Sequence, residues 1–417
     1  MGVKSKSPSR QPVSAPGSPL VEPEESFAEL EELARSAGAC VLEKMLQSRE
    51  RLDTATLVGK GKLEEIRQQA GALGADLLIF DHELTPTQQR NIERETDRRV
   101  VDRTQLILDI FARHARTREG QLQVELAQLS YLLPRLTGRG VEMSRLGGGI
   151  GTRGPGETQL EIDRRRIRRR IRWLGENLEA VRTQRMRRRS RRSSVPIATI
   201  ALVGYTNAGK STLFNQLTRA GVDASPQMFA TLDPTARKLE LPSRRRVLLS
   251  DTVGFIRNLP HTLIQAFRAT LEEVVEAEML LLVSDSSSPS RAQQDEQVER
   301  VLEEIGAGNQ SILRVCNKVD LLTPLDRVAL ETRGGTTLIS ARTGEGIPEL
   351  LAAIDQRLTV DPIEHVRLCF APQEGKMMSA VYQCGHVLHR EDSGDCVRLE
   401  AEIPRSLARH LREHLAR

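Results

Sequence analysis

The stretch Gly204-Tyr205-Thr206-Asn207-Ala208-Gly209-Lys210-Ser211 decides the fold of this chain. Its glycines let backbone N–H groups curl around the phosphates of a nucleotide, and a helix expected from about Lys210 points its positive N-terminal end at them. In this pattern Lys210 reaches the β and γ phosphates, and the Ser211 hydroxyl binds Mg²⁺ with Thr212 beside it. An apolar, β-rich run, residues 197–203, comes directly before the loop. The loop therefore has the strand and the helix that its chemistry requires.

Further apolar runs follow the phosphate loop at regular intervals. They predict strands at residues 246–250, 279–284, 312–316 and 337–339, and helical segments alternate with them to about Leu358. Such alternation is typical of a doubly wound fold. We therefore predict a P-loop α/β domain over residues 196–359, with a mostly parallel sheet and helices on both faces.

Two further segments are expected beside the γ-phosphate. Asp251-Thr252-Val253-Gly254 ends a predicted strand, where Asp251 can hold Mg²⁺ through water and the Gly254 amide can sense the phosphate. In Phe229-Ala230-Thr231-Leu232-Asp233, Thr231 can complete the Mg²⁺ coordination while the γ-phosphate is present. Loss of that phosphate would free both loops, which is an order-to-disorder switch. The predicted catalytic residues are Lys210, Thr231 and Gly254.

The choice of base depends on Asn317-Lys318-Val319-Asp320 at the end of a later predicted strand. Guanine presents N1–H and its 2-amino group as adjacent donors, which the single carboxylate of Asp320 can accept together, whereas adenine offers no such pair. Asn317 tethers loops and faces the purine edge, and the Lys318 stem covers the base. Ser340-Ala341-Arg342 then closes the site with a backbone N–H to the guanine carbonyl oxygen. This set predicts GTP over ATP.

The residue after Gly254 is Phe255, where many GTPases have the glutamine that orients the attacking water. Intrinsic hydrolysis is therefore expected to be slow, and a partner is expected to complete the site. The alternative is that a group of the same chain orients the water, either Arg237 or a loop from another domain.

One segment dominates the charge of the chain. The 417 residues carry a formal charge of +5, but residues 164–192 have fourteen arginines against Glu176 and Glu179, which is +12 locally and leaves −7 for the remainder. A basic block on an otherwise acidic molecule favours a polyanionic partner, and a solvated helix face is the alternative. Aromatic residues make up only 3% of the chain, which argues against a stacking platform for single-stranded nucleic acid. A nucleic-acid partner would then be held mainly through charge.

The rest of the chain divides into four parts. Residues 1–25, rich in Pro, Ser and Lys, are expected to be a disordered tail, because ordering them costs more entropy than burial returns. Residues 26–112 alternate helix and strand and predict a small N-terminal α/β domain. Residues 113–195 have two apolar stripes that step by three or four, which predicts an antiparallel helical hairpin whose first helix Pro134 kinks or ends. Residues 360–417 are expected to form a small α+β domain.

A glycine-rich loop, residues 147–157, lies between the two helices of the predicted hairpin. Without side chains it can approach an RNA backbone closely. A second nucleotide-phosphate loop is the alternative, although no strand and helix flank it. The basic arm of the hairpin suits A-form rRNA, whose phosphates and shape are readable without contacts to base edges.

The cysteines lack the paired close spacings of a zinc site or a redox motif, which indicates reduced thiols in the cytoplasm. They are Cys40, Cys316, Cys369, Cys384 and Cys396. Cys369, Cys384 and His386 could share a metal, but no fourth ligand has a suitable spacing, so packed side chains are the preferred interpretation. No apolar run approaches the roughly 18 to 20 residues that span a bilayer, and no apolar signal core is present. We predict a cytoplasmic protein without a membrane span.

Beyond the nucleotide motifs, the chain resembles the HflX family of ribosome-associated GTPases, within the Obg-like group of translational GTPases, from about residue 30 to residue 400. The similar segments are Val58-Gly59-Lys60-Gly61-Lys62, Phe80-Asp81-His82-Glu83-Leu84, Val101-Asp102-Arg103-Thr104, Tyr131-Leu132-Leu133-Pro134-Arg135-Leu136 and the glycine loop continuing to Thr158-Gln159-Leu160-Glu161. Phe255 is similar to the hydrophobic residue that replaces the glutamine in this group. The Pro/Ser tail and the dense arginines depart from the family pattern and leave the strength of RNA binding open.

The resemblance implies a GTP-hydrolysing switch with Mg²⁺ as cofactor. Its partners would be GTP, GDP and the rRNA and proteins of the large ribosomal subunit, which the hairpin would enter near the peptidyl transferase centre. The family implies ribosome-stimulated hydrolysis and the splitting of stalled ribosomes, particularly under stress, by a chain expected to be monomeric off the ribosome. The alternative is a GTP-gated rRNA-binding or ribosome-assembly factor that splits nothing. A membrane-linked regulator would need an amphipathic face with large apolar anchors, which the arginine block lacks.

Overall fold

The computed structural model describes most of the chain, in two compact units. The described residues are 2–4, 23–48, 51–136, 155–192, 197–219, 228–229, 231–257, 268–308, 310–331, 335–358, 363–371, 373–393 and 396–415. The first unit contains the chain up to Ala180 together with residues 227–229 and 258–267, and the second contains the remainder. Most of the predicted tail, the glycine loop before Pro155, and Ala230 lie outside the described residues.

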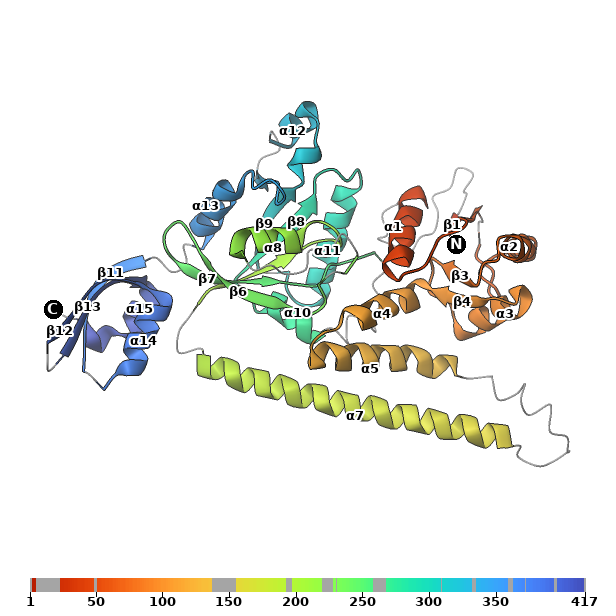
Figure 1. Ribbon diagram of the computed structural model, residues 1–417, viewed down its shortest axis with the longest axis horizontal. Coiled ribbons are helices and arrows are strands. Elements are labelled where there is room, and N and C mark those ends of the chain that lie inside the picture. The colour runs from red at the N-terminus through yellow and green to blue at the C-terminus, as the bar shows by residue number, and fades with distance from the viewer. Residues whose placement is uncertain are drawn as a thin grey trace. The chain divides into compact units, whose positions relative to one another are not determined.

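A six-stranded sheet forms the centre of the second unit, in the order β10-β9-β8-β5-β7-β6 (Figure 1). Its strands are β5 (Thr199–Val203), β6 (Thr235–Glu240), β7 (Arg246–Asp251), β8 (Met279–Asp285), β9 (Ser311–Asn317) and β10 (Thr336–Leu338). Neighbouring strands are parallel except for β6, which pairs antiparallel with β7. The predicted fold class is confirmed, and the polar edge strand β6 is an addition to the prediction.

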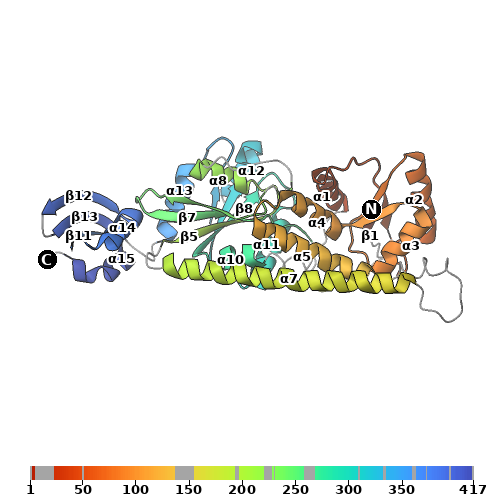
Figure 2. The ribbon, with the colours of Figure 1, turned by 60° about the horizontal axis from the view of Figure 1, so that its bottom comes forward.

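Helices cover both faces of this sheet (Figure 2). They are α8 (Lys210–Thr218), α10 (Arg268–Val275), α11 (Arg291–Glu304), α12 (Pro324–Glu331) and α13 (Ile347–Arg357). Alternate residues of β5 and β8 pack with Phe214 of α8 and Ile354 of α13 in one core, whereas Val298 of α11 is buried outside that core. The central strands β5 and β8 are apolar on both faces because both faces are covered, as expected for a parallel sheet.

The C-terminal part of the second unit is a three-stranded antiparallel sheet in the order β11-β13-β12. It consists of β11 (Ile363–Phe370), α14 (Gly375–Cys384), β12 (His386–Ser393), β13 (Cys396–Pro404) and α15 (Arg405–His410). The two helices pack on one small core with Phe370 and Ile403. Among the described residues, no group of three His, Cys, Asp or Glu side chains is arranged to hold a metal ion.

The first unit contains two short parallel strand pairs with helices around them. In chain order its elements are β1 (Gly2–Lys4), α1 (Pro23–Ser36), β2 (Leu46–Ser48), α2 (Lys60–Ala72), β3 (Leu77–Phe80), α3 (Pro86–Thr96), β4 (Arg99–Asp102) and α4 (Arg103–His114). Strand β1 pairs with β2, and α1 begins at Pro23, so part of the segment predicted as tail has regular structure. Helix α3 begins with a capping box, in which Thr85 and Gln88 satisfy each other's backbone N–H groups.

The predicted hairpin is formed by α5 (Arg118–Arg135) and α7 (Pro155–Arg192), which run antiparallel where they lie side by side (Figures 1 and 2). Pro134 lies in the last turn, and α5 ends one residue later. Leu122 of α5 and Leu174 of α7 are buried. No helix in the described part of the chain is long and apolar enough to cross a bilayer.

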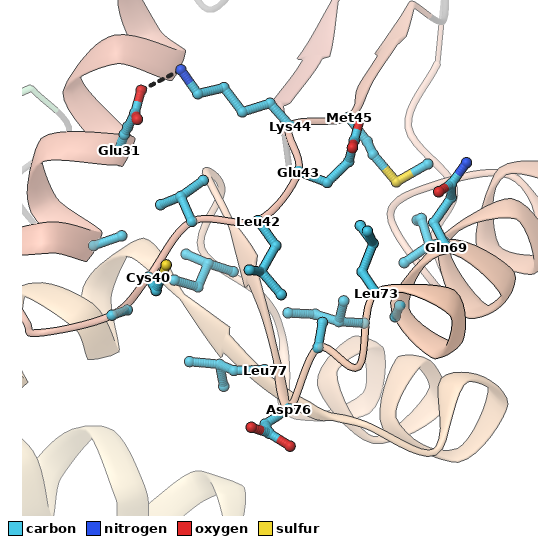
Figure 3. Close-up of a pocket in the computed structure, with 18 of the residues that line it drawn as sticks. Glu31, Cys40, Leu42, Glu43, Lys44, Met45, Gln69, Leu73, Asp76 and Leu77 are labelled. Carbon is cyan, nitrogen blue, oxygen red and sulfur yellow. Dashed lines mark ion pairs between the residues drawn. The ribbon is translucent and has the colours of Figure 1, made fainter.

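A cavity of about 500 Å³ lies in the first unit between α1, α2, β3 and residues 39–45 (Figure 3). Its lining is mostly apolar, and its single basic side chain, Lys44, is paired with Glu31. Glu43 and Asp76 add further negative charge. An apolar cavity with net acidic polar groups is a poor phosphate site, and none of its lining residues belongs to the predicted nucleotide site.

Candidate nucleotide site

The phosphate loop leaves the sheet from β5, which lies between β7 and β8. The strand order reverses at this point, and ligands of open α/β sheets bind there at the carboxyl ends of the strands. At two positions the backbone of the loop comes so close to neighbouring atoms that only glycine fits. A Cβ atom on Gly204 would lie 2.2 Å from the Val283 carbonyl oxygen, and one on Gly209 would lie 2.2 Å from Asn317 Nδ2. The backbone of the loop is thus held against β8 and β9 before α8 begins.

The ammonium group of Lys210 is turned inward and is held by the loop itself. Its Nζ donates to the carbonyl oxygens of Gly204 at 3.1 Å and Tyr205 at 2.7 Å, and the residue is only 7% exposed. Burial lowers the pKa of Lys210 to about 8, and the nearby Asp251 carboxylate opposes this shift. A buried cation held by two carbonyl oxygens is suited to an incoming polyanion.

The three predicted Mg²⁺ ligands lie together. Ser211 Oγ is 2.7 Å from Asp251 Oδ2 and 2.8 Å from Thr231 Oγ1, and Thr231 Oγ1 is 3.0 Å from the same carboxylate oxygen. Asp251 Oδ1 is buried and has no partner among the described residues, and burial raises the pKa of Asp251. Two hydroxyls and one carboxylate are the hard oxygen donors that Mg²⁺ takes, so these residues fit the ion.

The segment after Asp251 is attached to the phosphate loop through its backbone. Thr206 N–H donates to Phe255 O at 2.7 Å, Phe255 N–H donates to Gly204 O at 3.1 Å, and Arg257 N–H donates to Tyr205 Oη at 2.9 Å. Phe255 is 4% exposed. Its ring is therefore packed away from solvent, and its backbone holds this segment beside the phosphate loop.

Three other residues of these segments are also buried. Thr252 Oγ1 donates to Leu202 O at 2.5 Å, and Val253 and Gly254 lie beside it. Arg237, the alternative candidate for orienting water, lies exposed on β6 and donates to the carbonyl of its neighbour Ala236 at 3.0 Å.

Asn317 connects three loops, as its pattern predicts. Its Nδ2 donates to Ala208 O at 2.9 Å in the phosphate loop, and its Oδ1 accepts from Ala341 N–H at 2.9 Å in the loop after β10. Val319 is buried and its N–H donates to Ile339 O at 3.2 Å. The three strand ends are thus held in one arrangement.

The charged groups of the predicted base site remain accessible. The Asp320 and Arg342 residues are exposed, while Ser340 is buried and its Oγ accepts from Thr343 N–H at 3.2 Å. Lys318 Nζ lies 2.6 Å from Asp285 Oδ2, a pair that the nucleotide motifs do not predict. The position of Asp285 at the carboxyl end of β8 was the available signal, because such strand ends meet at the ligand edge.

Two residues that precede Thr231 make contacts within the first compact unit. Met228 and Phe229 belong to the first compact unit, where Phe229 packs edge-on against Phe111 of α4, with ring centroids 4.6 Å apart. Met228 N–H donates to Ser36 Oγ at 3.1 Å. Phe229 and Leu232 are buried, and Asp233 is half-buried.

Four family profiles match successive parts of the chain. The profile described as 50S ribosome-binding GTPase matches residues 199–318. Profiles for the GTP-binding GTPase N-terminal region, the GTP-binding GTPase middle region and the HflX C-terminal domain match residues 24–112, 114–192 and 327–417.

Relatives named GTPase HflX match nearly the whole chain. The protein of Caldanaerobacter subterraneus subsp. tengcongensis is 46% identical over 94% of this chain and 91% of its own length, and that of Escherichia coli K12 is 47% identical over 86% and 85%. A solved GTP-binding protein of Sulfolobus solfataricus, in complex with GDP, matches 80% of this chain and 95% of its own at 26% identity, with a TM-score of 0.42. The predicted resemblance is confirmed: the chain belongs to the HflX family of GTPases and is a GTP-hydrolysing enzyme.

Proposed function

We propose that this chain is a GTP-controlled factor that binds the large ribosomal subunit and splits or recycles stalled ribosomes, with its hydrolysis stimulated by the ribosome. The observation that carries this proposal is the exposed arginine face of α7 in a chain that also has a complete set of GTPase motifs. Within the described side chains of α7, Arg165, Arg168, Arg169 and Arg172 are exposed, and no described carboxylate lies within ion-pair distance of them. Unpaired cations on one helix are suited to the phosphates of folded RNA.

In the nucleotide site, the backbone N–H groups of residues 204–212 would surround the α and β phosphates. Lys210 would exchange its two carbonyl partners for β- and γ-phosphate oxygens. The negative charge of the phosphates would offset the free-energy cost of burying the ammonium group. Asp320 would accept the two guanine donors, Ala341 would donate to the guanine carbonyl oxygen, and the Lys318 stem, steadied by Asp285, would cover the base. These roles account for a preference for GTP over ATP.

Ser211 and Thr231 would hold Mg²⁺ directly, and Asp251 would hold it through water. When bound, the ion neutralises charge that develops on the β and γ phosphates. Thr231 would complete the Mg²⁺ coordination while the γ-phosphate is present, and the Gly254 N–H would donate to that phosphate. Loss of the γ-phosphate would release both segments, and this release is the proposed signal to the ribosome-bound parts of the chain.

Hydrolysis by the chain alone is expected to be slow because Phe255 offers no group that could orient a water molecule. Its buried ring and its two backbone bonds to the phosphate loop support a structural role for this residue. Arg237 bonds to its own strand, so a group supplied by the ribosome is the preferred source of the missing function. A ribosomal partner also implies action in the cytoplasm.

Steady-state GTP hydrolysis with and without large ribosomal subunits tests the stimulated activity. We expect a large increase in rate that is lost when Arg165, Arg168, Arg169 and Arg172 are changed to Glu and is retained when they are changed to Lys. No stimulation by the subunit would contradict the proposal.

Asp320→Asn should shift base preference from guanine to xanthine nucleotide, and an unchanged preference would contradict the guanine assignment.

Sedimentation distinguishes the two candidate functions. Incubation of intact ribosomes with the GTP-bound chain should convert the intact peak into subunits. An rRNA-binding or assembly factor without splitting activity would bind but leave the intact peak unchanged, and the stimulated hydrolysis would then belong to that second function.

A further inference from the structure

Trp173 is the single tryptophan of the chain, and it lies on α7 within the arginine block. The residue is 42% exposed, whereas the adjacent Leu174 is fully buried. Leu174 therefore provides the apolar packing of this turn of the helix, and the indole is not required for it. A large aromatic ring that is open to solvent and lies among cations can accept a stacking partner.

The exposed ring is held in place from one side. The Arg170 guanidinium carbon lies 4.3 Å from the centre of the Trp173 ring. Arg170 is itself fixed, because its Nε and Nη2 donate to the two carboxylate oxygens of Glu125 on α5 at 2.7 and 2.9 Å. A bidentate ion pair of this kind fixes the plane of the guanidinium group, and the stacked guanidinium restricts the orientation of the indole. The ring is thus preorganised, and the part that Arg170 does not cover remains accessible.

Arginines lie along the helix on the N-terminal side of the ring. Residues three, four and seven apart share one side of a helix, so Arg166, Arg169 and Trp173 form one stripe and Arg172 lies next to it. Arg166 is 3.9 Å from Asp163, but no described carboxylate lies within ion-pair distance of Arg169 or Arg172. Both side chains are exposed and available to phosphate groups.

We propose that Trp173 is a stacking position for an unpaired RNA base, with Arg169 and Arg172 binding the phosphates on either side of that base. An aromatic face accepts any base, and arginines beside it bind the backbone, which is the combination that holds unpaired nucleotides. The low aromatic content of the chain excludes an extended platform but not this single position. The proposal rests on the proposed function, because it deepens how the hairpin would bind rRNA, and it selects an unpaired nucleotide over a regular duplex.

The single tryptophan makes the test direct. The full-length chain is titrated with oligoadenylate of nine nucleotides, with an abasic oligonucleotide of the same length, and with inorganic polyphosphate, while tryptophan emission and binding are recorded. Oligoadenylate should change the emission in a saturable way, and the other two polyanions should bind without that change. Equal emission changes with all three, or none with bound oligoadenylate, would overturn the stacking position.

Two sets of variants separate stacking from charge. Trp173→Leu should weaken oligoadenylate binding by about 5- to 150-fold and leave the salt dependence of binding unchanged, and Trp173→Phe should restore most of the affinity. Arg169→Gln should instead flatten the salt dependence by about 0.7 in the log–log slope. Far-ultraviolet circular dichroism of each variant checks that α7 is intact. An affinity for oligoadenylate that is unchanged in Trp173→Leu with the helix intact would overturn the proposal.

A failure of the stacking position can be distinguished from a failure of the proposed function. Ribosome-stimulated hydrolysis with normal oligoadenylate binding by Trp173→Leu would retain the proposed function and remove the stacking position. If emission responds to large-subunit proteins stripped of RNA and not to oligoadenylate, this surface binds protein and the inference is wrong.

Discussion

Removal of the Asn317 side chain should open the nucleotide site without unfolding the molecule. Asn317 is 2% exposed, and its amide satisfies the Ala208 carbonyl and the Ala341 N–H, each at 2.9 Å. In Asn317→Ala both backbone groups lose a buried partner, which costs about 1–3 kcal/mol each. The free energy of local opening should therefore fall by about 2–6 kcal/mol, which is about 30- to 20,000-fold in hydrogen-exchange protection.

Hydrogen exchange followed by mass spectrometry on the full-length chain measures this opening segment by segment. Peptides covering residues 204–211 and 338–343 should lose protection, while peptides from α5 should not. Asn317→Asp keeps an acceptor for Ala341 N–H but sets a carboxylate oxygen against Ala208 O, so only the phosphate-loop peptide should lose protection. Asn91→Ala, which removes a bond to the Ala55 carbonyl in the first unit, is the matched control. Unchanged protection in both segments of Asn317→Ala would refute the tether.

Three further predictions concern the same site. Because burial lowers the pKa of Lys210 to about 8 in the free chain and bound phosphate favours its charged form, nucleotide affinity should fall by up to about tenfold per pH unit above pH 8; a flat profile to pH 9 would contradict this. Gly204→Ala forces a Cβ against Val283 O and should lower the melting temperature, whereas Gly175→Ala on α7, with open space, should raise stability by about 0.5–1 kcal/mol. Asp285→Asn frees the half-buried Lys318 and should weaken GTP and GDP binding equally, by at most about fivefold; calorimetry that finds a selective loss of GTP binding would exclude a role confined to the base.

A helix or strand could be predicted wherever the residues of that segment alone show its apolar pattern or its end signals. The apolar run before Gly204 and the helix from Lys210 follow from local residues, and the structure places β5 and α8 within two residues of the expected limits. Strands β6 and β12 escaped prediction because their sequences are polar and their burial patterns show little alternation. They exist because neighbours supply the pairing: Leu239 of β6 lies opposite Val247 of β7, and that register cannot be inferred from β6 alone.

In the candidate site, too, some contacts follow from single motifs and others depend on the order of the strands. Ser211, Thr231 and Asp251 could be predicted to meet because each motif implies its own place around one phosphate chain, and the hydroxyls do lie within hydrogen-bond distance of the carboxylate. The Lys318–Asp285 pair depends on β8 and β9 being neighbours, which is a property of the sheet order and not of either motif. The sequence indicated at Phe255 what hydrolysis lacks, but not that its backbone holds Gly204 and Thr206. Any substitution of Phe255 intended to restore a water-orienting side chain must therefore also preserve this backbone attachment, because a glutamine there would first have to leave a buried position.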